Sequence, residues 1–215
     1  MAVSLILDGV LCTLPGVETR CYADDRDIPR TVDGRRRLRR DVAGVVLHTV
    51  TGHPHQPQVL PGSLPSDRAE VLARYQARTE RQVSWHLTVD TDATVVQSAD
   101  VALWTCWHAG GVNPWTVGIE LCQGPGGALY EAQLTALVRV VDWLCTSLEI
   151  PRQYPMRAST GRPHGGLIPR LQGAAAPWGG VFGHRNQTSD RGHGDPGDAP
   201  FEALAAAGYV GVAFP

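Results

Sequence analysis

The sequence has 215 residues, enough for one domain with a substantial hydrophobic core. Hydrophobic residues make up 43% and charged residues 19%, and 24 glycines with 16 prolines indicate many loops around that core. The formal net charge of −2 favours no nucleic-acid partner, and no apolar run approaches the roughly 20 residues that cross a bilayer, so we expect neither nucleic-acid binding nor membrane insertion.

Two further features of the composition narrow the chemistry. All 19 basic residues are arginine, so a reaction that needs a cation has to use arginine, histidine or a metal ion. The five cysteines are an odd number without a CxxC pair, which predicts free thiols, with Cys145 in the core. The first residues carry Asp8 and no basic residue before Arg20, so we expect synthesis in the cytoplasm without a signal peptide.

The first forty residues differ in composition from the rest. A strand-like run from Val3 to Leu7 is followed by turn and charged residues, and an arginine-rich run extends from Arg35 to Arg40. We therefore predict an N-terminal extension or edge strand plus linker over 1–40 and a main domain over 41–215. The arginine run fits a solvated linker; the alternative is a patch attracted to an anionic cell-surface polymer or nucleic acid.

The main domain opens with a strand and a helix. The β-branched run from Val42 to His48 predicts a buried strand whose last residue, a histidine, opens onto a site. Asp67 with Glu70 resembles a capping box, and the apolar residues that follow at helical spacing predict a first helix. That apolar stripe consists of Val71, Leu72 and Tyr75.

Two segments with a period of two come next. The alternation from Val83 to Val89 predicts a half-buried hairpin strand with His86 on its polar face. The alternation from Trp115 to Cys122 places Trp115 with the apolar residues and Glu120 on the other face. Because an unpaired buried carboxylate is costly, Glu120 needs a partner, and a metal-bound water would serve.

The last third of the domain contains the strongest helix and a second strand that ends in histidine. Apolar residues at helical spacing predict a helix from Tyr130 to Ile150, ended by Pro151, that covers one face of the sheet. The Gly/Pro-rich segment 157–180 is predicted to be a loop that borders the site. Val181 and Phe182 then lead to Gly183 and His184, and a short helix is expected over 200–207.

These two strand-end histidines, with an aspartate in the Gly-rich turn just beyond the second, match the ligand types of a catalytic zinc site. His48, His184 and Asp195 supply three protein ligands, and such a site leaves a fourth position for water. Spacing alone leaves open the alternative that these are hydrogen-bonded structural histidines.

Four separated motifs carry a family resemblance: VVLH ending at His48, VSWHLTVDTDATVVQ over 83–97, WHAGGVNPWTVGIEL over 107–121 and GHRNQTSDRGHGDPG over 183–197. The chain resembles the zinc-dependent N-acetylmuramoyl-L-alanine amidases of the peptidoglycan-recognition fold over about residues 42–207. The resemblance implies an α/β (α+β) fold with a central mixed β-sheet flanked by helices, and an amidase catalytic domain over 41–215.

The resemblance also implies roles for individual residues. His48, His184 and Asp195 would hold Zn²⁺, and Glu120 falls at the position of the catalytic carboxylate. The recycling-type enzymes place a lysine two residues before the ligand Asp. Here that position is His193, which would stabilise the oxyanion, whereas Arg191 is the less favoured substitute.

Four residues match positions near the family's substrate groove: Trp85, His86, His108 and Asn113. Trp85 stands where phage enzymes of this type carry a tyrosine, which disfavours a tyrosine-assisted mechanism. We expect all four to contact substrate, with the alternatives that His86 orients a neighbour and Asn113 caps a turn.

The implied reaction is zinc-dependent hydrolysis of the amide between N-acetylmuramic acid and L-alanine in peptidoglycan or a muropeptide, by a monomer. The alternative is a non-catalytic peptidoglycan-binding module of the same fold. The loop 50–58 and the segment 157–180 also leave another amide substrate conceivable. Without a signal peptide, the protein would act on the cell wall after release, as an endolysin, or after delivery, as an effector; cytoplasmic recycling is the further alternative.

Overall fold

The computed structural model describes residues 4–23, 36–51, 55–172 and 177–215. Six strands form a central sheet: β3 (Thr19–Cys21), β4 (Gly44–Thr49), β6 (Leu87–Val89), β7 (Val95–Gln97), β8 (Thr116–Leu121) and β11 (Gly180–Gly183). The helices are α1 (Arg68–Arg78), α2 (Glu131–Leu148) and α3 (Ala199–Ala206). Short two-stranded pairs are β1 (Leu5–Leu7) with β2 (Val10–Cys12), β5 (Val59–Leu60) with β9 (Leu129–Tyr130), and β10 (Gln153–Arg157) with β12 (Val210–Phe214).

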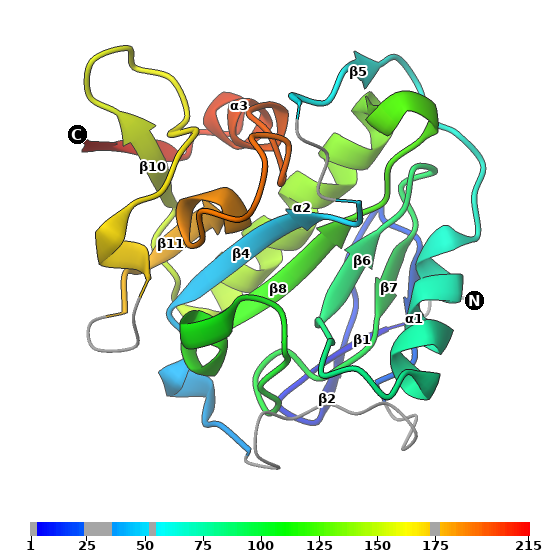
Figure 1. Ribbon diagram of the computed structural model, residues 1–215. Coiled ribbons are helices and arrows are strands. Elements are labelled where there is room, and N and C mark those ends of the chain that lie inside the picture. Colours follow the sequence, from blue (N-terminus) through cyan, green and yellow to red (C-terminus); the bar gives the residue numbers. More distant parts are fainter. Residues whose placement is uncertain (1–3, 24–35, 52–54, 173–176) are drawn as a thin grey trace.

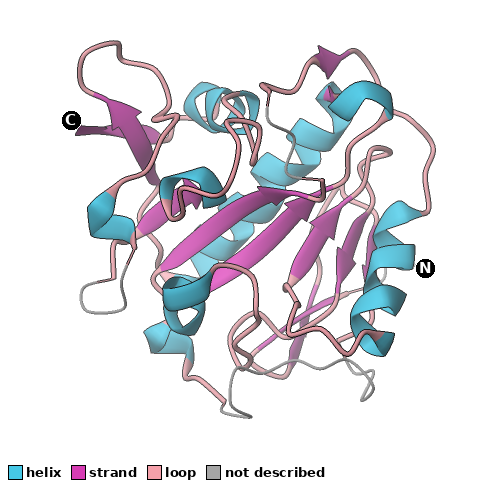
Figure 2. Cartoon of the chain, viewed as in Figure 1, coloured by secondary structure: helices cyan, strands magenta, loops and turns pink. Residues whose placement is uncertain are grey.

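The central sheet is mixed. Its strand order is β11-β4-β8-β6-β7-β3, and within it β6 and β7 pair antiparallel while the other neighbours are parallel. Helix α2 lies behind β4 and β8 in the view of Figure 1, and α1 lies beside β7. Figure 2 shows the same arrangement, with loops joining the elements at both ends of the strands. The predicted α/β fold with a central mixed sheet flanked by helices is confirmed.

The main hydrophobic core lies between the sheet and α2. Val45 and Leu47 of β4 and Ile119 of β8 pack in one cluster with Leu137 and Leu144 of α2. Each large apolar side chain buried in this way contributes roughly 1.5–3 kcal/mol to folding. Because successive side chains of a strand point to opposite faces, burial of these residues against α2 turns His48 and Glu120 to the other face of the sheet.

That other face has its own smaller cluster, which corrects one prediction. Trp115 does not join Val117 and Ile119 but ends the 3-10 helix η3 (Gly110–Trp115). Its ring packs against Phe182 of β11, with ring centroids 5.8 Å apart. The alternation of β8 therefore begins only at Thr116.

The predicted long helix is confirmed as α2. It ends where Glu149 adopts a left-handed conformation with φ of 57°, and Pro151 follows. The strand ending before His184 and the helix near residue 200 are confirmed as β11 and α3.

Helix α1 is present, but its predicted cap and buried stripe are wrong. The Asp67 side chain makes no capping hydrogen bond; instead Asp90 Oδ2 accepts from the backbone N–H of Ala69 at 2.7 Å. The face turned to the sheet carries Ala69, Ala73 and Gln76, whereas Val71 and Tyr75 are 50% and 40% exposed. The alanines let the helix approach the sheet, and Leu72 and Tyr75 border a cavity.

The predicted polar face of the hairpin is also wrong. Strand β6 is paired on both edges, by β8 and β7, and its residues are buried on both faces, as is His86 directly before it. A central strand of a sheet with packing on both sides has no half-exposed face, which the local alternation could not reveal.

The arginine run is only partly solvated. Arg36, Arg39 and Arg40 are exposed, as a linker predicts, but Arg37 is buried. Its guanidinium donates to the backbone carbonyls of Val101 at 2.7 Å, Thr116 at 2.6 Å and Asn113 at 3.2 Å. The linker interpretation is wrong for this residue, and Arg35 lies outside the described residues.

The two ends of the chain contribute strands. Part of the predicted N-terminal run forms β1, with Leu5 and Leu7 in the main core, and β3 joins the sheet beside β7; Val3 lies outside the described residues. The strands β10 and β12, which pair in parallel, were not predicted. The five cysteines form no disulfide, and Cys145 is buried. Within the described residues, every helix is too short or too polar to cross a membrane.

Candidate functional site

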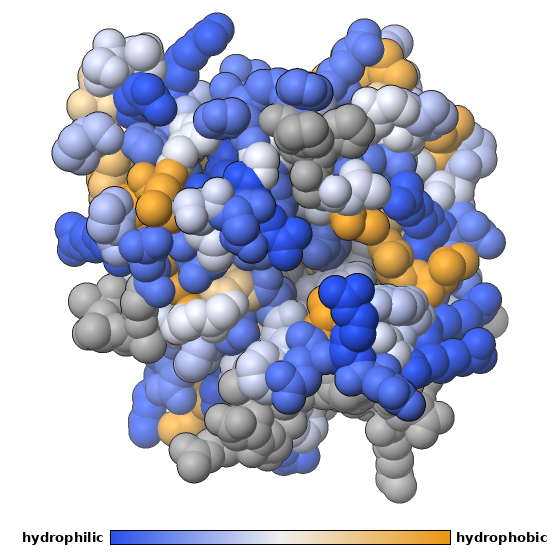
Figure 3. Space-filling view, viewed as in Figure 1, coloured by the Kyte–Doolittle hydropathy of each residue, from blue (hydrophilic) through white to orange (hydrophobic). Residues whose placement is uncertain are grey.

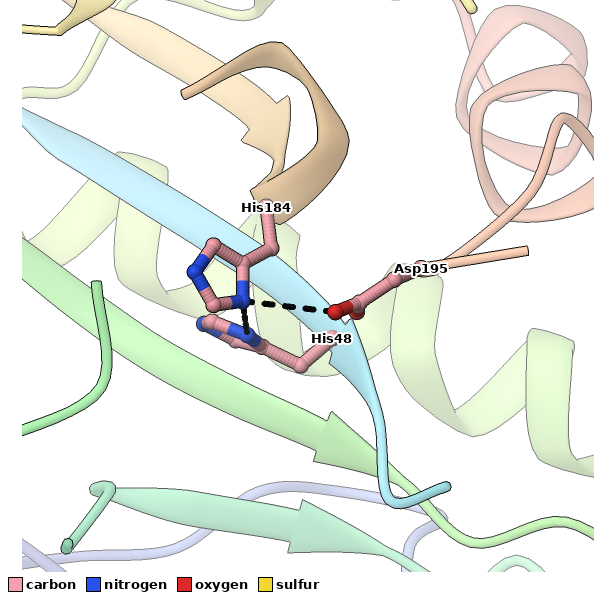
Figure 4. Close-up of side chains that lie close together, drawn as sticks. All are labelled: His48, His184 and Asp195. Atoms are coloured by element: carbon pink, nitrogen blue, oxygen red, sulfur yellow. Dashed lines mark hydrogen bonds and ion pairs between the residues drawn. The ribbon is translucent and has the colours of Figure 1, made fainter. Parts of the chain in front are cut away.

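Three potential metal ligands meet at the carboxyl ends of two neighbouring strands. His48 belongs to the end of β4, His184 follows β11 directly, and Asp195 comes from the loop after it. The Nδ1 atoms of His48 and His184 are 3.0 Å apart, and His184 Nδ1 is 3.3 Å from Asp195 Oδ2. Figure 4 shows the three side chains pointing toward one another.

The fold brings these residues together for clear reasons. Since β4 and β11 are adjacent and parallel, their carboxyl ends lie at the same edge of the sheet. The backbone N–H of Thr49 donates to Asp195 Oδ1 at 2.9 Å, and the Thr49 hydroxyl donates to the carbonyl of Gly194 at 2.8 Å. A side chain on Gly183 would meet Pro196 at 2.8 Å, so glycine lets the Asp195 loop approach β11.

The cluster has the dimensions and the chemistry of a metal site. Ligands about 2.0–2.1 Å from a tetrahedral zinc ion are separated by roughly 3.3 Å, close to the separations seen here. All three side chains are buried, and their ligand atoms lie within 4.8 Å of one another. Burial, with the nearby His184, His108 and Arg191, holds the pKa of His48 well below its usual range, so its imidazole is neutral and able to bind a cation. These residues could hold a zinc ion.

A carboxylate faces the same space. Glu120 of β8 lies opposite His48 of β4 and lines the cavity next to the cluster. Its Oε2 atom is buried and has no hydrogen-bond partner among the described residues. Burial and the neighbouring Asp195 raise the pKa of Glu120 to about 8. A water molecule or a cation in the cavity would give this oxygen the partner that it lacks.

The cavity has a volume of about 390 Å³ and joins the cluster to an apolar wall. The wall includes Leu72 and Tyr75 of α1, with Val83 and Trp85 from the segment that precedes β6. In Figure 3, hydrophobic side chains gather on this face over α1, beside a hollow. Two arginines, Arg81 and Arg191, also line the cavity.

The predicted groove residues divide into two groups. Trp85 and His108 line the cavity, but His86 and Asn113 do not. His86 is buried, and its Nδ1 accepts from the backbone N–H of Gly118 at 3.0 Å. Asn113 Oδ1 accepts from the backbone N–H groups of His108 and Ala109 at 3.2 and 2.6 Å. Both side chains form hydrogen bonds within the protein and lie outside the cavity lining, as the alternatives of an orienting histidine and a turn-capping asparagine describe.

His193 is not placed for its predicted role. Its side chain is exposed, its Nδ1 lies 2.8 Å from the carbonyl of Gly165, and it is absent from the cavity lining. Arg191, two residues earlier, lines the cavity, and its Nε is 3.9 Å from Asp195 Oδ2. The side chain of this loop that lines the cavity is therefore Arg191, the less favoured of the two residues in the sequence analysis.

Several residues around the site escaped sequence reasoning. Thr49 fixes Asp195, and Leu72, Tyr75 and Arg81 line the cavity. Thr49 could have been noticed as the residue directly after a candidate ligand. The apolar stripe of α1 was recognised but was interpreted as a buried face, because sequence alone does not show which side of a helix meets the sheet.

Comparisons with known proteins give one family match and several solved structures of low sequence identity. The family model described as N-acetylmuramoyl-L-alanine amidase matches residues 38–198. Among solved structures, a mutant endolysin from Bacillus subtilis matches with 20% identity and a TM-score of 0.46, over 63% of this chain and 80% of that one. An endolysin N-acetylmuramoyl-L-alanine amidase, LysCS from Clostridium intestinale URNW, matches with 15% identity and a TM-score of 0.45, over 87% and 94%.

A third structure is the Staphylococcus aureus hydrolase AmiA in complex with its ligand. It has 15% identity and a TM-score of 0.45, and the match covers 95% of this chain and 74% of that one. No curated protein matches the sequence.

Proposed function

Because this chain belongs to the N-acetylmuramoyl-L-alanine amidase family, an enzyme family that cleaves an amide bond of peptidoglycan, we propose that it does so with a zinc ion held by His48, His184 and Asp195. The single observation that carries the proposal is the convergence of these three buried ligands beside the unpartnered oxygen of Glu120. The bond cleaved joins the lactyl group of N-acetylmuramic acid to L-alanine of the stem peptide.

The metal has one task in this proposal. When bound, a zinc ion would supply Lewis acidity toward the scissile carbonyl and toward water. His48, His184 and Asp195, which would hold the ion, all line the cavity.

Glu120 moves the proton. Its carboxylate takes a proton from the attacking water as the new C–O bond forms, and it returns that proton to the leaving nitrogen as the C–N bond breaks. The raised pKa of Glu120 suits the second step, and a cation held by the neighbouring ligands would lower that pKa enough for the first.

Arg191 takes the place that the sequence had assigned to His193. Its guanidinium lines the cavity beside Asp195, so its N–H groups are available to the carbonyl oxygen on which negative charge develops. The wall formed by Leu72, Tyr75 and Trp85 would contact the apolar parts of the sugar and the peptide.

The setting of the enzyme is part of the proposal. We assign catalysis to a domain over 41–215 that acts as a monomer on the cell wall after release or delivery, like an endolysin or an effector; a recycling role on soluble muropeptides is the alternative. A binding module without catalysis would not need a buried, unpartnered carboxylate oxygen in the same cavity as the three potential ligands, so Glu120 favours an enzyme.

Purified sacculi test the proposal. The zinc-loaded protein should release stem peptides with a free L-alanine amino group, detected by mass spectrometry, while the glycan strands stay intact. Chelation should stop the release and added zinc should restore it. His184→Ala should lose both zinc and activity, whereas His55→Ala, at an exposed histidine outside the cluster, should keep both. Zinc-loaded protein that binds sacculi without releasing peptide would identify a binding module instead.

A further inference from the structure

A series of hydrogen bonds connects β8 and the segment before it to His48, one of the three potential metal ligands. It runs from the carbonyl of Val112 to the hydroxyl of Thr116 (2.9 Å), from Thr116 to His108 Nε2 (3.2 Å), and from His108 Nδ1 to His48 Nε2 (3.2 Å). The last member, His48, presents its other nitrogen to His184. This series of hydrogen bonds, here called the relay, therefore connects the Val112 carbonyl to the proposed metal ligand His48.

We propose that Thr116 and His108 are positioning residues that fix His48 in one tautomer, with its hydrogen on Nε2 and the lone pair of Nδ1 directed at the metal position. The proposal rests on the proposed function only in identifying the group at Nδ1 as a metal ion. The hydrogen-bond pattern itself involves only protein atoms and does not depend on a bound metal.

The direction of each bond follows from the available hydrogens. A carbonyl can only accept, so the single hydrogen of the Thr116 hydroxyl is donated to Val112. Thr116 can then only accept from His108, so the hydrogen of His108 is on Nε2. A neutral imidazole has no second hydrogen, so His108 Nδ1 accepts from His48 Nε2. That donation leaves His48 Nδ1 bare.

The surroundings of His108 keep it neutral. The buried guanidinium of Arg37 lies 3.0 Å from His86 Nε2, and the His86 ring centroid is 5.8 Å from that of His108, so a positive charge on His108 would be repelled. The imidazolium form, which would carry a hydrogen on both nitrogens and reverse the last bond, is therefore disfavoured at neutral pH.

His108 is also held in place at its ring and at its backbone. A side chain at Gly118 would meet ring atoms of His108 at 2.6–2.9 Å, so the ring lies directly against the backbone of β8. Asn113 Oδ1 accepts from the backbone N–H of His108 and fixes the other end of the residue. Glycine at 118 and asparagine at 113 thus serve the relay, although neither lines the cavity.

The consequence concerns metal binding. A free histidine exchanges its hydrogen between two nitrogens, and a ligand that has to change tautomer binds less tightly. Here the tautomer is set before a metal arrives. In the metal-free protein the hydrogen between the two facing Nδ1 atoms then belongs to His184, since His48 has none to give.

Histidine nitrogen NMR on the full chain tests this directly. Long-range ¹H–¹⁵N correlations of the metal-free wild type should show His48 and His108 protonated at Nε2, and His48 should keep that pattern when zinc is added. Finding His48 protonated at Nδ1 in the metal-free protein would overturn the proposal, and this measurement needs no variant.

Variants test the origin of the effect. Thr116→Val removes the hydroxyl with little change in shape, and we expect mixed His48 tautomers and a zinc Kd raised roughly tenfold. Thr116→Ser should restore both wild-type values, and Thr135→Val, which removes an exposed hydroxyl on α2, should change neither. An unchanged tautomer and Kd in Thr116→Val would refute the relay.

The two proposals fail in different ways. If wild-type protein binds no zinc or binds it without cleaving peptidoglycan, the proposed function fails while the His48 tautomer can still be measured. If zinc binds and the amide is cleaved but Thr116→Val behaves like wild type, only the relay fails.

Discussion

Glu120 lies directly opposite His48 in the parallel register of β8 and β4. Adjacent central strands therefore carry the proposed proton carrier and a proposed metal ligand on the same face of the sheet. Strands hold side chains more rigidly than loops do, so the distance between carboxylate and metal position is set by the sheet itself. His184 follows the next strand, β11, and Asp195, in the loop after it, is the third proposed ligand.

Replacing Glu120 should separate metal binding from catalysis. Glu120→Gln keeps the shape of the side chain but cannot take a proton, so we expect zinc content to stay at the wild-type level while kcat on muropeptide falls by about 10²–10⁴. Metal analysis and peptide release measured on the same sample check this. Glu202→Gln, at an exposed carboxylate of α3, is the matched control, and an active Glu120→Gln enzyme would remove Glu120 from the mechanism.

The buried Glu120 should also make the metal-free protein less stable as pH rises. Its pKa of about 8 in the folded protein exceeds the usual 4.5, so between these pH values the folded state keeps a proton that the unfolded state has lost. The free energy of unfolding then falls with pH, by at most about 1.4 kcal/mol per unit, and the decline ends above pH 8.

Glu120→Gln lacks this proton. With a chelator present, the free energy of unfolding of wild type should therefore fall between pH 5 and pH 8 relative to that of the variant. Urea denaturation at several pH values measures both. Parallel pH profiles for the two proteins would show that Glu120 is ionised in the folded state throughout.

The sequence predicted the elements of the fold that have strong periodicity. Residues 130–150 have the apolar spacing of a helix over five turns, and the runs before His48 and His184 are short and β-branched, so α2, β4 and β11 were identified. The strands β10 and β12 were missed because they have no such pattern; β10 contains Pro155 and β12 contains Gly211. Their pairing depends on contacts between distant segments.

The site was predictable to the extent that motifs carry chemistry. The resemblance identified the residues that converge as His48, His184, Asp195 and Glu120. It could not show where a loop turns its side chains, and so it ranked His193 above Arg191. It could not show either that His86 and Asn113 are buried, because burial depends on what packs above the strand.

Metal binding should stabilise the folded protein. A ligand that binds only the folded state adds about 2.7 kcal/mol to the free energy of unfolding at a hundredfold excess over its Kd, so zinc should raise the Tm of wild type. Because Asp195 is one of three proposed ligands, Asp195→Asn should show a much smaller rise, and Asp92→Asn, outside the cluster, should respond like wild type. Calorimetry with and without zinc makes the comparison, and an equal rise in all three proteins would place the metal elsewhere.

The cation that assists the reaction should be Arg191. We expect Arg191→Gln to lower kcat by about 10²-fold, because a donor aimed at a developing oxyanion contributes mainly in the transition state. His193→Gln, two residues away in the same loop, should lower kcat less than threefold, since its ring bonds to Gly165 outside the cavity. Kinetics on a soluble muropeptide distinguish the two variants, and the opposite ranking would restore the assignment made from sequence.

Arg37 should be essential for stability although it lies in an arginine-rich run. Its guanidinium donates to three backbone carbonyls, and two of them, at Asn113 and Thr116, belong to the segment that holds His108. Arg37→Met would leave these carbonyls buried without donors, at about 1 kcal/mol or more each, so the free energy of unfolding should fall by about 3 kcal/mol. Urea denaturation of the metal-free protein measures this loss.

The neighbouring exposed arginine provides the control for that measurement. Arg40→Gln removes the same charge from the same run, and at an exposed position the change should stay within about 0.5 kcal/mol. The difference between the two losses in free energy of unfolding separates the effect of the buried hydrogen bonds of Arg37 from the effect of removing one positive charge. If both variants lose the same stability, the run acts through its net charge and Arg37 has no special place. If only Arg37→Met loses stability, this variant should also bind zinc less tightly. Arg37 donates to the carbonyls of Asn113 and Thr116, which lie in the segment of the proposed positioning residues His108 and Thr116.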